Sequence, residues 1–107
     1  MSREPLPVGG SFVEHITPVG GNIFADLGFP PEEAENLRVR FRLMTEVLRI
    51  IQERGLRQQQ AAAVFGVSQP RISDLKRGRI DSFTIDSLVN MLAHAGVSVE
   101  VTVRAAA

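Results

Sequence analysis

The middle of the chain carries an apolar residue every three or four positions, which is the spacing of a helix with one buried face. Pro31 suits the first position of a helix, where a missing N–H does no harm, and Gly55 suits its end. The pattern predicts a helix over 31–54. Its stripe is the expected core face, although the N-terminal end is also suited to packing on a partner. The stripe consists of Ala34, Leu37, Phe41, Met44, Leu48 and Ile51.

Shorter elements are expected after this helix. Two short helices are predicted over 58–65 and 69–76, joined by "GVS". A last helix begins at the cap Thr84 and ends at Gly96. Its apolar positions are Ile85, Leu88, Val89 and Leu92, and Phe83 is placed to form a hydrophobic staple with Leu88.

The hydrophobic period changes from that of a helix to that of a strand near the C-terminus. "VSVEVTV" alternates strictly over 97–103, which predicts a half-buried β-strand. A lone strand leaves its backbone groups unpaired, so a partner is required. Both "SFVEHI" at 11–16 and the same strand of a second copy fit this role. In the second case a homodimer forms through the valine face, which consists of Val97, Val99, Val101 and Val103.

Composition narrows the class of protein. The 107 residues suit one domain, with residues 1–22, rich in Gly, Pro and Ser, as a flexible arm and 23–107 as the folded part. The absence of cysteine excludes disulfides and thiolate metal sites. We expect a cytoplasmic protein without a membrane partner, since neither a signal peptide nor a sufficiently long apolar run is present.

The charges are unevenly distributed although the net charge is zero. Residues 54–80 contain six basic side chains and only one acidic side chain, Asp74. The basic residues are Arg54, Arg57, Arg71, Lys76, Arg77 and Arg79. A basic block in a neutral chain indicates a surface for nucleic acid.

The same block contains the sequence "GVSQPRISDLKRG" at 66–78. Gly66 can end one helix in the left-handed conformation, Ser68 can cap the next, and Pro70 falls in its first turn. Ala62 is small where two helices would cross closely. These features together describe a helix-turn-helix motif over 58–78.

The stretch "LRQQQAAAVFGVSQPRISDLKRG" at 56–78 resembles the helix-turn-helix of the Xre/Cro-type regulators. Arg57 departs from the threonine that often caps the first short helix there. The resemblance implies a mainly α fold, a five-helix lambda-repressor-like DNA-binding domain, here with a flexible arm and one C-terminal β-strand. Because one helix-turn-helix makes too few base contacts for a tight site, we also expect a homodimer that binds a palindromic operator in double-stranded DNA.

The resemblance places the second short helix in the major groove. Gln69 is then suited to adenine and Arg71 to guanine, while Asp74 either accepts from cytosine or pairs with Arg71 or Arg77. Gln58 is expected at a phosphate, and any contact from Pro70 is apolar. The complete set expected at DNA is Gln58, Ser68, Gln69, Pro70, Arg71, Ser73, Asp74, Lys76, Arg77 and Arg79.

Three parts of the chain resemble HigA-type antitoxins, which pair with RelE/HigB-like toxins. They are the leader "GNIFADLGFPPEEAENL" at 21–37, the long helix and "VEVTV". This resemblance implies an antitoxin that represses its own operon and neutralises an mRNA-cleaving toxin. Phe24, Leu27 and Phe29 form an apolar segment among carboxylates, which suits a basic partner such as this toxin. Two alternatives stay open: these side chains fold back on the protein itself, or the chain is a stand-alone repressor. No catalytic or metal-binding cluster is recognisable, so we expect no enzymatic activity and no cofactor.

Overall fold

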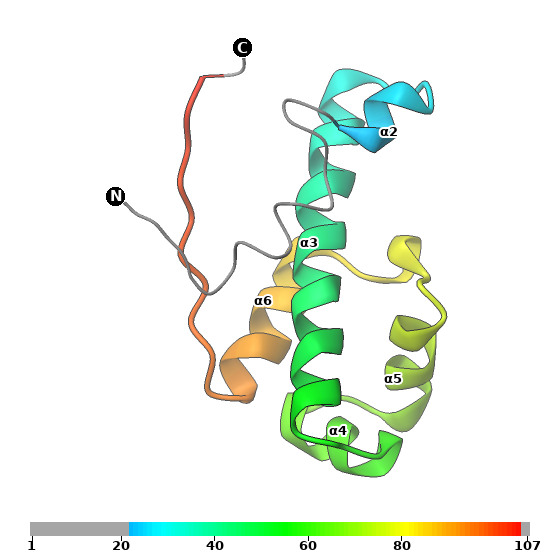
Figure 1. Ribbon diagram of the computed structural model, residues 1–107, viewed down its shortest axis with the longest axis vertical. Helices are drawn as coiled ribbons and strands as arrows, with labels where there is room; N and C mark the ends of the chain where they lie inside the picture. The colour runs from blue at the N-terminus through cyan, green and yellow to red at the C-terminus, as the bar shows by residue number, and fades with distance from the viewer. Residues whose placement is uncertain (1–21, 106–107) are drawn as a thin grey trace. The chain divides into compact units, whose positions relative to one another are not determined.

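Five α-helices and one 3-10 turn follow one another in the computed structural model, which describes residues 22–105 (Figure 1). They are α2 (Ile23–Asp26), α3 (Pro31–Glu53), α4 (Gln58–Phe65), α5 (Gln69–Lys76), η1 (Ile80–Ser82) and α6 (Ile85–His94). The predicted fold class, mainly helical with five helices, is confirmed. The bounds of α3, α4 and α5 agree with the prediction to within one residue, whereas α6 ends two residues before Gly96 and α2 was not predicted as a separate helix. The arm, apart from Asn22, and the segment 11–16 lie outside the described residues.

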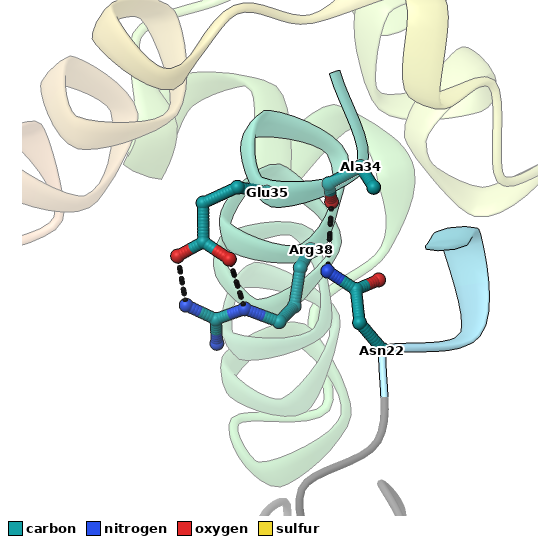
Figure 2. Close-up of polar contacts among 4 residues, drawn as sticks. All are labelled: Asn22, Ala34, Glu35 and Arg38. Carbon is teal, nitrogen blue, oxygen red and sulfur yellow. Dashed lines mark hydrogen bonds and ion pairs between the residues drawn. The ribbon is translucent and has the colours of Figure 1, made fainter. Parts of the chain in front are cut away.

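The described residues belong to two compact units, and the division falls within α3, after Arg38. The first unit contains α2 and the start of α3. Asn22 caps α2, since its side-chain oxygen accepts hydrogen bonds from the N–H groups of Phe24 and Ala25. The Nδ2 of Asn22 donates to the carbonyl of Ala34 at 3.2 Å and so ties α2 to α3 (Figure 2).

An ion pair on the first turns of α3 lies beside this contact. Arg38 donates through Nε and Nη2 to the two carboxylate oxygens of Glu35, at 3.0 and 2.6 Å (Figure 2). These hydrogen bonds hold the pKa of Glu35 below its ordinary value; burial opposes this effect, and the positive charge of Arg38 adds to it. Both side chains are largely exposed, so the pair contributes little to stability.

The second unit has a core built from the rest of α3 together with α4, α5 and α6. Side chains from all four helices meet in it, so α3 buries a broader face than the single predicted stripe. Leu43, Val47 and Ile50 are buried outside that stripe, whereas Phe41 is 46% exposed and Leu48 is only partly buried. The prediction that Phe41 belongs to the core face is therefore wrong. The largest fully buried side chains are Val47, Phe65, Ile72, Leu75, Phe83, Leu88 and Leu92.

The cap and staple predicted for α6 are present. Thr84 Oγ1 accepts from the N–H of Ser87 at 3.0 Å, and Ser87 Oγ accepts from the N–H of Thr84 at 3.0 Å. This reciprocal pair satisfies two backbone donors at the start of the helix. Phe83 and Leu88 are both buried in the core, as a staple requires.

The C-terminal β-strand predicted over 97–103 is not formed. No strand is assigned anywhere within residues 22–105, and the residues after Gly96 leave α6 as a single stretched segment (Figure 1). Val97 and Val99 pack partly against the core, whereas Val101 and Val103 are 78% and 87% exposed. The alternating pattern supplies one apolar face, but a strand also needs a hydrogen-bonded neighbour, and the described part of this chain does not provide one.

Candidate nucleic-acid interface

The turn between α4 and α5 depends on Gly66. Its backbone is left-handed, with φ 69° and ψ 33°, a conformation that costs glycine no side-chain clash. The N–H of Val67 then returns to the carbonyl of Ala62 at 2.9 Å, which closes the end of α4. Ala61 and Ala62 are buried where α4 contacts α5 and α6. The predicted glycine turn with small residues behind it is confirmed.

The imidazole of His94 packs against this turn. Its Nδ1 lies 2.9 Å from the carbonyl oxygen of Val64, and the ring covers Gly66. A Cβ on residue 66 would lie 2.8 Å from the Cδ2 of His94. A histidine in the last turn of α6 therefore ties α6 to the end of α4 and to the turn that follows it.

The start of α4 is capped although Arg57 cannot supply an acceptor. The side-chain oxygen of Gln60 accepts from the N–H of Arg57 at 2.9 Å, which is one half of a capping box. Gln58, expected at a phosphate, is the first residue of α4 and is half-buried.

The predicted side-chain cap of Ser68 on α5 is absent. Ser68 occupies the N-cap position with an extended backbone, but its hydroxyl makes no capping hydrogen bond. The physical reason lies in the next residues. Pro70 has no N–H to offer, and the N–H of Arg71 donates to the carbonyl of Ser68 at 3.1 Å. The exposed Ser68 hydroxyl thus stays at the start of α5 without a capping role.

The buried face of α5 defines which residues point outward. Ile72 and Leu75 are fully buried, so the opposite face of the helix is the one available to a partner. Of the residues expected at DNA, the exposed ones are Ser68, Gln69, Pro70, Lys76, Arg77 and Arg79, and the half-buried ones are Gln58, Arg71, Ser73 and Asp74.

Arg71 turns toward the protein rather than away from it. Its Nη1 donates to the carbonyl of Ser82 at 2.7 Å, and its Cζ lies 4.1 Å from the centre of the Phe83 ring. A guanidinium over an aromatic face is held by cation–π attraction as well as by the hydrogen bond. In this position at least one of its donors is used within the protein rather than offered to a guanine.

Asp74 contacts a basic residue other than those considered from the sequence. Its Oδ1 lies 3.8 Å from the Nε of Arg79, and not beside Arg71 or Arg77. The distance is long and the Arg79 side chain is exposed, so the pair holds Arg79 only weakly. A second contact was not predictable from the motif: Arg40 on α3 donates through Nη1 to the carbonyl of Ile80 at 3.1 Å.

Two classes of site are not seen in the described part of the chain. No group of three His, Asp or Glu side chains within residues 22–105 is arranged to hold a metal ion. No helix in this range combines the length and the apolar character that crossing a membrane requires.

Comparison with known proteins identifies the fold. A family model described as a helix-turn-helix domain matches residues 23–104. A solved structure assigned to the XRE family of transcriptional regulators is similar with a TM-score of 0.63 and 29% sequence identity, over 68% of this chain and 82% of that chain. No curated protein matches. The family match spans most of the chain, so the protein belongs to the helix-turn-helix domain family, and its fold is similar to that of the XRE-family regulator.

Proposed function

We propose that α5 reads a specific DNA sequence through Gln69 and Ser73, while Lys76, Arg77 and Arg79 contact phosphates. The exposed face of α5, opposite the buried Ile72 and Leu75, is the observation that supports this proposal. A helix of this kind fits the major groove, where an amide can hydrogen-bond adenine in pairs. Cations at the end of the helix suit the backbone on either side of the groove.

Replacing Gln69 by alanine is expected to weaken binding to the preferred duplex by about 1–3 kcal/mol and to relax preference at one base position. Replacing Arg77 by alanine should instead weaken binding to every sequence and reduce the slope of log affinity against log salt by about one. Both effects can be measured by titrating a duplex that the parent protein selects from a random library. If both variants bind as the parent does, α5 is not the reading helix.

We further propose that the protein is the antitoxin of a HigBA/RelE-type pair, which represses its own operon and neutralises an mRNA-cleaving toxin. The support lies in the first unit, where Leu27 is 68% and Phe29 39% exposed. Phe24 meets Phe29 edge to face, with ring centres 6.2 Å apart. Several carboxylates lie close by in the sequence: Asp26, Glu32, Glu33 and Glu35. Apolar anchors among carboxylates suit a basic partner such as an RNA-cleaving enzyme.

A double variant, Leu27→Glu with Phe29→Ser, is expected to abolish neutralisation of the toxin in cells that express both proteins. The reason is that buried apolar anchors supply most of the affinity of an interface. Phe41→Ser is a matched control, because Phe41 is exposed to a similar degree in the second unit. Binding to the selected duplex should be unchanged in the double variant.

Full neutralisation by the double variant would place the toxin on another surface. The stand-alone repressor is the alternative function, and the adjacent reading frame separates the two. A small basic protein encoded there supports the antitoxin, whereas its absence supports the repressor.

We propose, finally, that the protein acts as a homodimer joined by antiparallel pairing of 97–103, with the two α5 helices about 34 Å apart on a palindrome. One helix-turn-helix makes few base contacts, so two copies are needed for a tight site. The exposed side chains of Val101 and Val103 support this assembly.

A further inference from the structure

We propose that Arg71 and Arg40 are positioning residues that hold the turn after α5 in place for DNA, and that Arg71 does not read a base. The inference rests on DNA binding by α5. It concerns residues 77–83, which contain the exposed Arg77 and Arg79 as well as η1.

The backbone N–H groups of this turn donate to carbonyls that are close by in the sequence. Within the described chain, the N–H groups of residues 77–83 that bond to backbone carbonyls reach back no further than Ser73. The N–H of Arg79, for example, donates to Asp74 at 3.1 Å, and that of Ser82 donates to Arg79 at 3.0 Å. Such local bonds define the shape of a turn but not its placement against the rest of the domain.

Packing of Ile80 and Phe83 on the core supplies part of that placement, and two arginines from different helices add hydrogen bonds to it. Arg71 comes from α5 and binds the carbonyl of Ser82, and Arg40 comes from α3 and binds the carbonyl of Ile80. The two acceptors are the first and last residues of η1. Hydrogen bonds from a charged group to a carbonyl are among the stronger ones in proteins. η1 is thereby attached to both α3 and α5.

The Phe83 ring makes the contact of Arg71 specific for a guanidinium. Phe83 is buried, and the planar group of Arg71 covers its face while one nitrogen reaches the Ser82 carbonyl. A lysine keeps the charge but cannot form the planar stack and the directed hydrogen bond together. To reach a base, Arg71 would have to give up both contacts.

The test compares Arg71→Lys with the parent on the selected duplex and on single-base variants of it, well below the unfolding temperature of each protein. A positioning role predicts about tenfold weaker binding to every duplex, with the preference at each base position unchanged. It also predicts that Arg71→Lys costs much less when Arg77 is already alanine, because both changes then act through the same turn. Phe83→Leu keeps an apolar side chain in the core but removes the aromatic face, so below its own, lower unfolding temperature it should show the same uniform loss of binding as Arg71→Lys.

Relaxed preference at a single base position, with additive effects of Arg71→Lys and Arg77→Ala, would make Arg71 a base-reading residue and overturn the proposal. Unchanged binding by Arg71→Lys would overturn it as well. Failure of the parent to select any duplex would instead refute DNA reading by α5. Different results would therefore refute the positioning role of Arg71 and the reading of DNA by α5.

Discussion

Replacing Gly66 by alanine is expected to lower the free energy of unfolding by about 3 kcal/mol. A left-handed backbone costs an alanine roughly 1–2 kcal/mol. The new Cβ would also lie 2.8 Å from the His94 ring, which must then move and lose its contact with the Val64 carbonyl, for about another 1 kcal/mol. In a domain of this size the melting temperature should fall by roughly 10–20 °C. Thermal and urea unfolding followed by circular dichroism measure both quantities.

Gly78 offers a matched control for this experiment. It has φ 74°, close to the 69° of Gly66, but a Cβ there would meet nothing within 4 Å. Gly78→Ala should therefore show the backbone cost alone. In a His94→Ala background, Gly66→Ala should cost no more than Gly78→Ala. If Gly66→Ala and Gly78→Ala are equally destabilising in the parent, the contact between His94 and the turn does not contribute to the free energy of unfolding.

The helix boundaries were predictable because their signals are local. Gly66 ends α4 and Pro70 stands in the first turn of α5 because of the backbone conformations that these residues favour, whatever surrounds them. The side chain of Ser68 was less predictable for a reason that is also local. The proline two residues later removes one of the donors that the hydroxyl would accept.

The contacts that orient the candidate site could not be predicted, because they join residues far apart in the sequence. Arg71 and Phe83 form their pair across the end of the motif, and Arg40 lies forty residues from its acceptor, Ile80. From the motif alone, a basic residue on a recognition helix is expected to contact DNA. Only the neighbouring aromatic ring and carbonyl reveal that the half-buried Arg71 side chain is held against the domain.

Residues 97–103 show the limit of a hydrophobic pattern in a different way. Alternation predicts which side chains share a face, and that face is divided: Val97 and Val99 pack on the core, whereas Val101 and Val103 do not. Whether the segment forms a strand depends on a partner, which the pattern does not specify. The homodimer is a prediction about that partner.

Replacing Val101 by proline is expected to convert the proposed dimer into a monomer and to weaken binding to a palindromic duplex by at least a hundredfold. Proline has no N–H to donate to the partner strand, so it weakens the pairing of the two strands. Loss of the dimer then removes the contact with one half-site. Val101→Thr is the control, since threonine keeps the N–H and a high strand propensity. Light scattering reports the mass. A monomeric parent, or a proline variant that stays dimeric, would contradict strand pairing.

The register of this pairing leads to a second measurable result. In a two-fold antiparallel pair, the valines share one face only if one residue lies opposite its own copy. Glu100 at the axis would bring two carboxylates together, which is unfavourable, whereas Val101 or Thr102 would not. The chain has no cysteine, so single cysteine substitutions at 100, 101 and 102 can be oxidised separately.

Only the residue at the two-fold axis has its own copy directly opposite, at a separation that a disulfide can bridge. We therefore expect rapid cross-linking of the dimer at position 101 or at position 102, but not at both, and slow cross-linking at position 100. Ala105→Cys, at an exposed site beyond the paired segment, gives the rate for random collision. Equal rates at all four positions would mean that 97–103 has no fixed register, and the dimer would have to form through another surface.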